Sequence, residues 1–163
     1  MESNAVLTQQ RESLRMGAAF RGEPRRRTVV FQGQVLLIEN LRERRQLLCD
    51  MLAQEHFEVG VVEDARDAVQ LLSESLFSEQ AKMPELIICN ARMLGDVGLA
   101  ALERLCASNP DVPVILYSAF TSPKLRERMA RIGGAWVLEP SSDLEDLRSA
   151  AVSLAAASRQ TGF

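Results

Sequence analysis

The chain has 163 residues, of which 47% are hydrophobic and 25% charged, and its formal net charge is −3. These values are typical of one globular domain and give no general attraction to nucleic acid or to a membrane surface. No apolar run reaches about 18 residues, so the sequence has no candidate membrane-spanning helix. The amino-terminal residues lack the apolar core of a secretory signal, and we therefore expect a cytoplasmic protein with no membrane or direct nucleic-acid partner.

Three segments are predicted along the chain. Residues 1–32 are expected to form a flexible arm, residues 33–158 one globular domain, and residues 159–163 a short tail. The arm ends in the arginine-rich stretch 21–27, which we interpret as a solvated linker. Contact of these arginines with nucleic acid or with an acidic partner is the alternative.

The first half of the domain alternates between apolar runs and amphipathic stretches. Residues 35–38 form a predicted buried strand. Residues 41–54 follow as a helix whose predicted inner face holds Leu47, Leu48, Met51 and Leu52. After a second strand over 57–62, Asp64 is expected to cap a helix that reaches about Leu76, with an inner face of Ala68, Val69, Leu72 and Leu76.

The second half continues the same alternation. A uniformly apolar run over 86–89 predicts a buried central strand that stops at Asn90, and a turn leads from it into a helix over 97–107. Residues 113–117 form the fourth predicted strand, and residues 135–138 the fifth. Between them lies a helix that Thr121 or Ser122 caps, that has Pro123 in its first turn, and that ends at Gly133 and Gly134.

The last helix is expected to reach about Ser158, with Ser142 and Glu145 as a candidate capping box. Five strands that alternate with five helices predict an α/β fold, a doubly wound five-stranded parallel sheet with right-handed crossovers. In such sheets ligands and chemistry are found at the carboxyl ends of the strands. Asn90 is predicted to lie at such an end.

The cysteines do not indicate a metal or catalytic site. Cys49, Cys89 and Cys106 lack metal-ligand spacing, and each lies within an apolar pattern, so we expect three buried free thiols. Cys89 at a strand end is a conceivable nucleophile, but no His or Asp is spaced to activate it. His56 is too isolated to complete a catalytic pair.

Several short motifs follow the predicted strand ends in a fixed order. Met93 stands three residues after Asn90, and the pair Gly98–Leu99 stands eight and nine residues after it. Ser118–Ala119 follows the fourth strand and Glu139–Pro140 the fifth, with Trp136 three residues before Glu139. In this order and spacing the sequence, over about Gln34 to Ala156, resembles the response regulator receiver domain. The resemblance implies the flavodoxin-like (βα)5 fold of the CheY-like family.

The residues that carry the family's chemistry are changed. In the family, two acidic residues after the first strand hold a magnesium ion, an aspartate after the third accepts the phosphoryl group, and a Ser or Thr and a Lys follow the fourth and fifth. The corresponding positions here are Glu39, Asn40, Asn90, Ser118 and Glu139. A carboxamide does not supply the anionic nucleophile, one carboxylate is a poor magnesium site, and Glu139 puts negative charge where a cation is needed. We therefore expect no phosphorylation at Asn90, no metal, no cofactor, no catalytic residue and no enzyme activity.

Three of these residues have simpler interpretations. Asn90 either caps the turn into the next helix or has a hydrogen-bonding role. Glu139 either points into solvent or contacts Ser118 or Asn90, and Ser118 could donate to the carbonyl oxygen of Asn90 or to the carboxylate of Glu139. Trp136 is either a packed, partly exposed aromatic or an anchor for a partner.

The resemblance implies a stand-alone pseudo-receiver, a phosphorylation-independent interaction module in bacterial signal transduction or transcriptional regulation. Its partner would be a histidine kinase, another response regulator, a transcription factor or a second copy of the chain. The predicted interaction face lies on the fourth helix, fifth strand and fifth helix and includes Lys124, Arg126, Arg128, Arg131 and Trp136. The first helix, with Arg42, Glu43 and Arg45, is the second candidate surface.

Three alternatives stay open at this point. The chain could be the receiver part of a longer two-component response regulator whose DNA-binding output is missing, since no helix-turn-helix pattern follows the last helix. It could be an atypical receiver phosphorylated at another residue, for which Asp64 and Asp96 are poor candidates away from the strand end. An enzyme using the same crevice would need a Gly-rich phosphate loop, and none follows any predicted strand.

Overall fold

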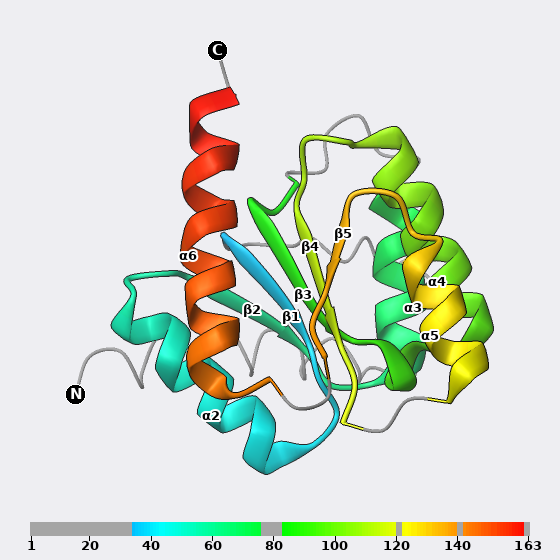
Figure 1. Ribbon diagram of the computed structural model, residues 1–163, viewed down its shortest axis with the longest axis horizontal. Helices are drawn as coiled ribbons and strands as arrows, with labels where there is room; N and C mark the ends of the chain where they lie inside the picture. Colours follow the sequence, from blue (N-terminus) through cyan, green and yellow to red (C-terminus); the bar gives the residue numbers. More distant parts are fainter. Residues whose placement is uncertain (1–33, 76–82, 120–121, 140–141, 162–163) are drawn as a thin grey trace, which may run out of the picture.

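The structure is a computed structural model that describes residues 34–75, 83–119, 122–139 and 142–161 (Figure 1). The predicted arm with its arginine-rich stretch, and the residues Leu76, Thr121 and Pro140, lie outside the described residues. Within the described ranges, no helix is long and apolar enough to cross a membrane.

The predicted parallel sheet is confirmed. Its strands are β1 (Val35–Ile38), β2 (Val59–Val62), β3 (Leu86–Asn90), β4 (Val114–Tyr117) and β5 (Ala135–Val137). All neighbours pair in parallel, in the order β2-β1-β3-β4-β5. This order reverses at β1 and β3, so the crevice at the carboxyl ends lies beside these two central strands.

Helices cover both faces of the sheet, as predicted. They are α2 (Arg42–Gln54), α3 (Ala65–Ser75), α4 (Ala91–Ser108), α5 (Pro123–Ala130) and α6 (Leu144–Thr161). Helices α2 and α6 lie on one face, and α3, α4 and α5 lie on the other (Figure 1). The last helix runs on to Thr161, beyond the predicted end at Ser158, and its final turns extend past the sheet (Figure 1).

Alternate residues of each central strand enter two separate cores. In β1, Leu36 and Ile38 pack with the α3, α4 and α5 layer, whereas Val35 and Leu37 pack with the α2 and α6 layer. This follows from the two-residue side-chain period of a strand that is buried on both faces. The three cysteines are free and buried in these cores, as predicted.

Two predicted helix faces need correction. Leu47 is 52% exposed, because the buried face of α2 follows Arg45, Leu48, Cys49 and Leu52, from which Leu47 is turned away. In α3, Ala68 and Leu72 are buried as predicted, but Leu71 takes the buried place expected for Val69, which is only half-buried.

Two predicted helix caps are confirmed. The Asp64 carboxylate accepts hydrogen bonds from the backbone N–H groups of Arg66 at 2.7 Å and Asp67 at 3.3 Å. The Ser122 hydroxyl accepts from the backbone N–H of Leu125 at 3.1 Å. Each cap satisfies donors that the first turn of a helix leaves without a partner.

The predicted capping box of the last helix is shifted by one residue. The backbone N–H of Asp146 donates to the Asp143 carboxylate at 2.9 Å, and that of Asp143 donates to the Asp146 carboxylate at 3.0 Å. Ser142 and Glu145 therefore do not form the box. The physical reason is that two aspartates at this spacing provide the same reciprocal bonds with charged acceptors, which are the stronger ones.

Helix α4 begins six residues earlier than predicted, directly after Asn90. A kink at Gly95, with φ of 63° and ψ of −174°, divides it into a short first turn and a longer second part. The φ value lies in the left-handed region that favours glycine. The first turn packs closely against the second part, because a Cβ at Gly98 would lie 2.7 Å from the Cβ of Leu94.

This close approach gives a first prediction. Gly98→Ala is expected to destabilise the domain by about 1–3 kcal/mol, because the added methyl group overlaps Leu94 and must displace the turn that follows Asn90. Gly133→Ala is the matched control, since a Cβ there meets nothing within 4 Å and should change stability by less than about 0.5 kcal/mol. Urea unfolding measures both, and equal effects of the two variants would contradict the prediction.

Candidate functional site

Three of the five predicted site positions are buried at the carboxyl edge of the sheet. Glu39 follows β1, Asn90 ends β3 and Ser118 follows β4, and they are 0%, 8% and 3% exposed. Asn40 and Glu139 are exposed instead. The structure brings Glu39 and Asn90 into direct contact, and it leaves Asn40 and Glu139 at the rim.

The centre of the site is the fully buried carboxylate of Glu39. The Asn90 side-chain amide donates to it, with Nδ2 3.2 Å from Oε1 and 3.4 Å from Oε2. The backbone N–H of Leu41 donates to Oε1 at 3.0 Å, and the Tyr117 hydroxyl donates to Oε2. Both carboxylate oxygens therefore have hydrogen-bond donors, which is what a charged group needs when it leaves water. We call Glu39, Asn90, Tyr117 and the Leu41 N–H the Glu39 cluster.

Sequence reasoning missed Tyr117, the single tyrosine of the chain. It ends β4 in register with Asn90, which ends β3, so the two residues are cross-strand neighbours. A polar-tipped aromatic at the end of an apolar run was the signal in the sequence that could have identified it. Burial, and then the hydrogen bond to Glu39, raise the pKa of the Tyr117 hydroxyl well above its usual value of 10.0. The Arg44 guanidinium lies 5.6 Å from the ring centre.

Arg45 supports the loop after β1, and its predicted place on a surface of the first helix is wrong. Its NH1 donates to the backbone carbonyls of Glu39 at 3.3 Å and Asn40 at 3.2 Å, and its Nε lies 3.4 Å from a carboxylate oxygen of Glu63. Arg45 is only 6% exposed, so it is not available on the surface of the first helix where the sequence placed it. The guanidinium fork instead ties the loop after β1 to the loop after β2.

The structure decides between the two interpretations of Asn90. Its side chain makes no capping bond to α4, and its amide N–H donates to the carboxylate of Glu39 instead. Its other polar atom, Oδ1, is buried and has no hydrogen-bond donor among the described residues, so the Ser118 hydroxyl does not bond to it. The Glu139 carboxylate is exposed, and the described part of the chain offers it no hydrogen bond or ion pair.

The cluster does not fit a magnesium ion. Magnesium is held through carboxylate and other oxygen ligands, but here the one buried carboxylate is surrounded by N–H and O–H donors. No group of three or more His, Cys, Asp or Glu side chains in the described ranges is placed to hold a metal ion. Cys89 is no better as a nucleophile, because burial, and then the charge of Glu39, raise the pKa of its thiol well above the usual value.

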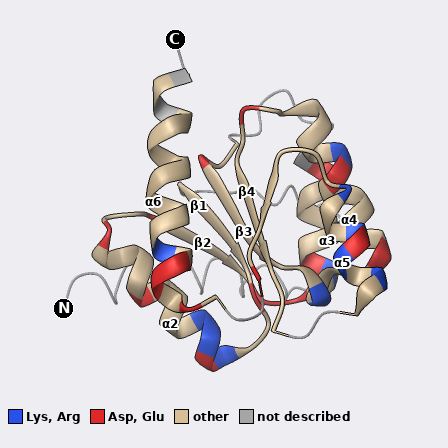
Figure 2. Cartoon of the chain, viewed as in Figure 1, with Lys and Arg blue, Asp and Glu red and all other residues tan. Residues whose placement is uncertain are grey.

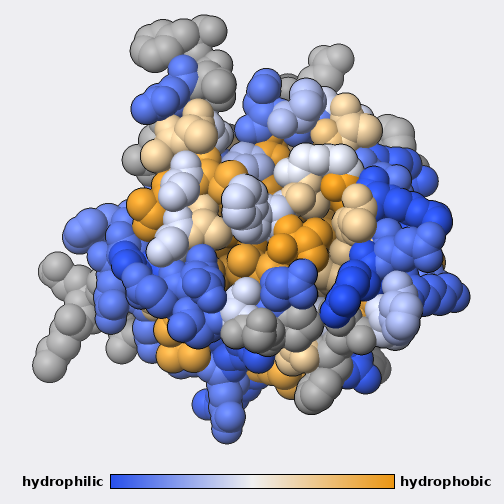
Figure 3. Space-filling model, viewed as in Figure 1, coloured by the Kyte–Doolittle hydropathy of each residue, from blue (hydrophilic) through white to orange (hydrophobic). Residues whose placement is uncertain are grey.

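The predicted interaction face is separate from this cluster. Trp136 on β5 is 54% exposed, and Val137 beside it is 36% exposed. Apolar side chains gather in a hollow over this part of the sheet, with hydrophilic side chains on the α5 side (Figure 3). Charged residues line α5 (Figure 2).

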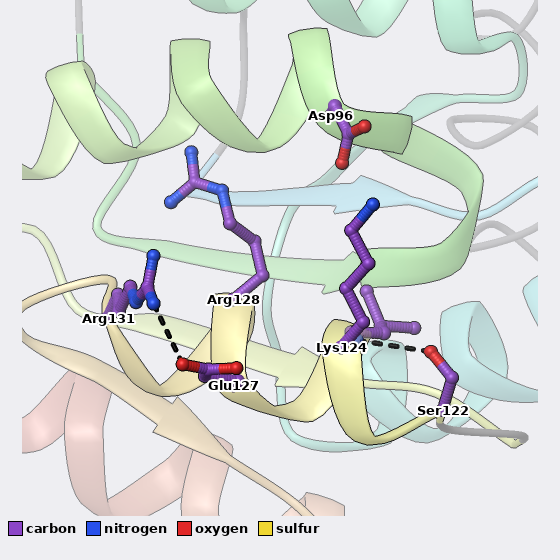
Figure 4. Close-up of a pocket in the computed structure, with 7 residues that line it drawn as sticks. Asp96, Ser122, Lys124, Glu127, Arg128 and Arg131 are labelled. Carbon is purple, nitrogen blue, oxygen red and sulfur yellow. Dashed lines mark hydrogen bonds and ion pairs between the residues drawn. The ribbon is translucent and has the colours of Figure 1, made fainter.

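Most of the predicted basic strip on α5 is exposed, but part of it is neutralised. Arg128 pairs with Glu103 of α4 at 2.6 Å, and Arg131 pairs with Glu127 at 2.8 Å. Lys124 has no ion-pair partner among the described residues, and Figure 4 shows it extending from α5 toward Asp96 of α4. These helices border a cleft of about 370 Å³, lined by Asp96, Ser122, Lys124, Leu125, Glu127, Arg128 and Arg131.

The fold and the position of the site define a known class of domain. The family model of the response regulator receiver domain matches residues 35–152, and the chain belongs to this family. It is therefore a receiver domain of two-component signalling, a class that interacts with signalling proteins such as kinases and response regulators.

Curated relatives are longer proteins. The chain is 23% identical over 128 residues to the transcriptional regulatory protein ZraR of Salmonella typhimurium, a match that covers 78% of the chain and 27% of that protein. It is 23% identical over 115 residues to ZraR of Escherichia coli K12, covering 71% of the chain and 24% of that protein. The chain thus spans about a quarter of the length of these relatives.

Solved receiver structures share the fold. The signal receiver domain of an HD domain-containing protein from Pseudomonas fluorescens Pf-5 matches with a TM-score of 0.62 and 21% identity, covering 80% of this chain and 99% of that one. The signal receiver domain of a putative Luxo repressor protein from Vibrio parahaemolyticus matches with a TM-score of 0.60 and 21% identity, covering 80% and 95%. At this identity the likeness establishes the fold alone.

Proposed function

We propose that this chain is a pseudo-receiver, an interaction module that signals without being phosphorylated. The observation that carries the proposal is the Glu39 cluster. At the edge where a receiver of the ordinary kind uses carboxylates for a cation and a phosphoryl group, this chain has one carboxylate whose two oxygens accept bonds from its own side chains and backbone. A carboxamide at position 90 has no anionic oxygen with which to attack phosphorus.

The surroundings of Asn90 support the same conclusion. The charge on a transferring phosphoryl group needs cations nearby. Glu139 adds a negative charge at the rim, and Arg45, the buried cation close to Glu39, is used by two carbonyls and Glu63. The proposed site therefore has neither the nucleophile nor the charge balance of phosphoryl transfer.

Chemical inertness is the direct test. Incubation with acetyl phosphate and magnesium is expected to leave the intact mass of the chain unchanged, while a phosphorylatable receiver domain in the same reaction gains one phosphoryl group. Mass spectrometry gives the readout. A stoichiometric gain on this chain would overturn the proposal, and peptide mapping would then show whether Asp64, Asp96 or another residue had accepted the group.

The partner is proposed to bind at the face formed by α5, β5 and α6. Trp136 supports this choice, because a half-exposed tryptophan beside another exposed apolar residue has the composition of an interface anchor. The candidate partners are a histidine kinase, another response regulator, a transcription factor and a second copy of the chain. We further propose that the role is regulatory rather than enzymatic.

Trp136→Ala is expected to weaken partner binding at least about tenfold, since truncation of a central aromatic anchor commonly costs that much or more. The matched control is Leu47→Ala on α2, because Leu47 is 52% exposed and Trp136 is 54% exposed. A partner captured from the native cell with the parent chain would be measured against each variant by calorimetry. If Leu47→Ala weakens binding and Trp136→Ala does not, the interface lies on α2.

One observation favours a second candidate, in which the same domain is the receiver part of a transcriptional regulator. The curated relatives that it matches are transcriptional regulatory proteins, of which it spans about a quarter. The two candidates differ in the length of the native protein, because a regulator like these relatives is several times longer than this chain. An immunoblot of the native cell distinguishes them: a much longer protein would favour the second candidate, and one of this chain's size would favour the first.

A further inference from the structure

We propose that Tyr117 closes the receiver site by taking the place of a cation at Glu39, so that restoring an acceptor aspartate alone does not restore metal binding. This inference rests on the proposed function, because it explains how the site is held without phosphorylation chemistry. It adds one residue, Tyr117, that neither the sequence nor the family comparison had singled out.

The first step is the charge of Glu39. Its side chain is fully buried, and no Lys or Arg side chain forms an ion pair with it among the described residues. A buried carboxylate without a counter-ion must be stabilised by donors, or it is strongly unfavourable. Three groups supply those donors: the Asn90 amide, the Leu41 N–H and the Tyr117 hydroxyl.

The second step is the place of the hydroxyl. Tyr117 donates to Oε2 of Glu39, the oxygen that the Leu41 N–H does not use. Its ring belongs to the core between the sheet and helices α2 and α6, which also contains Ile115 and Leu147. The buried ring therefore fixes the position of the hydroxyl. The positive end of a fixed O–H dipole thus faces the oxygen that a metal ion would need.

The third step is what remains for a metal ion. With Nδ2 directed at Glu39, the cluster has two other side-chain oxygens: Asn90 Oδ1, which is buried and lacks a donor among the described residues, and the Tyr117 hydroxyl, which donates to Glu39. Two neutral oxygens and one occupied carboxylate are a poor set of ligands for magnesium, which prefers anionic oxygens and gives up water reluctantly. Asn90→Asp would add a second carboxylate, but the Tyr117 hydroxyl would still donate its hydrogen bond to Glu39 Oε2.

The test is a titration with Mn²⁺ as the probe ion, and calorimetry measures the binding. Four proteins are compared: the parent, Asn90→Asp, Tyr117→Phe and the double variant. Phenylalanine removes only the hydroxyl and keeps the ring in its core. The parent and Tyr117→Phe are expected to show no saturable binding up to ~5 mM, because each lacks a second carboxylate. The double variant is expected to bind at least about tenfold more tightly than Asn90→Asp, because the ion need not displace a hydrogen bond to a charged group.

Two results would overturn the inference. The first is binding by Asn90→Asp that equals binding by the double variant, which would mean that Tyr117 is no obstacle. The second comes from the parent itself, whose single tyrosine can be observed by ultraviolet resonance Raman spectroscopy without any substitution. A spectrum that shows no strongly donating hydroxyl would contradict the proposed contact even if the double variant does not fold.

The same experiments separate this inference from the proposed function. A phosphoryl group gained by the parent chain would overturn the pseudo-receiver, whatever the metal titration shows. Equal Mn²⁺ binding by Asn90→Asp and the double variant would overturn only the role of Tyr117. Circular dichroism of each variant confirms that the binding constants refer to folded protein.

Discussion

Glu39→Gln is expected to destabilise the domain by about 2–4 kcal/mol, because the buried carboxylate is the common acceptor of three donors, two of which are on buried side chains. Glutamine has nearly the same shape, but one of its two terminal atoms is an NH₂ group. That group would face the Asn90 amide, the Tyr117 hydroxyl or the Leu41 N–H, and at least one of these donors would lose its acceptor. The loss is large because the Asn90 and Tyr117 side chains are buried and cannot turn to water.

Urea unfolding measures the effect, with Glu58→Gln as the control. Glu58 is exposed just before β2, so the same chemical change there should alter stability by less than about 0.5 kcal/mol. A midpoint shift for Glu39→Gln that is no larger than the shift for Glu58→Gln would contradict the account of the Glu39 cluster. It would mean that the carboxylate is reached by solvent.

The large elements of this fold were predictable because their patterns are strong. The runs at 35–38 and 86–89 are apolar throughout and the run at 113–117 is almost so, as expected for central parallel strands, and they form the three middle strands of the sheet. Asp64 and Ser122 are capping residues placed before amphipathic stretches, and both cap helices. In each case local preference and tertiary position agree.

The misses occur where a tertiary contact outweighs the local pattern. Helix α4 starts at Ala91 because Gly95 allows the chain to kink in the left-handed region and Gly98 allows the first turn to lie close to the second part. Neither property is visible in the hydrophobic period. Leu47 was assigned to the core because it is apolar, yet the helix turns Arg45 inward instead, since the loop carbonyls of Glu39 and Asn40 need its guanidinium.

The candidate site shows the same limit. The sequence predicts which positions meet at the carboxyl edge, because parallel strand ends share one edge. It does not predict that Tyr117 reaches Glu39, because the register of β3 and β4 places Tyr117 beside Asn90 only in the folded sheet. A polar group hidden in an apolar run is identified by its partner, and that partner is distant in sequence.

The second large prediction concerns alkaline pH. Folding raises the pKa of Tyr117 above its usual value of 10.0, first through burial and then through the hydrogen bond to Glu39. Below pH 10 the tyrosine holds its proton in both states, and its contribution to stability is fully present. Above pH 10 the unfolded chain loses the proton and the folded chain keeps it, so stability is expected to fall by about 1.4 kcal/mol per pH unit from this group.

Two thiols contribute to the same decline. Burial, and then neighbouring acidic groups, raise the pKa of Cys89 well above 9.0 and that of Cys106 from 9.0 to about 11. Above about pH 9 each thiol loses its proton in the unfolded chain before it does so in the folded chain, so the free energy of unfolding decreases. For Cys106 this decrease is complete near pH 11. The contribution of Tyr117 must be isolated by comparison with a variant that keeps both thiols.

Tyr117→Phe is that variant. At pH 8 it is expected to be less stable than the parent by about 1.5–3 kcal/mol, because Glu39 loses a donor. Above pH 10 the variant has no tyrosine proton to lose in the unfolded state, so the stability gap should narrow by about 1.4 kcal/mol for each further pH unit. Urea unfolding between pH 8 and pH 11 measures the gap, and the absorbance of the single tyrosine reports its ionisation. A gap that stays constant, or a folded chain whose tyrosine ionises near pH 10, would show that the hydroxyl is not held by Glu39.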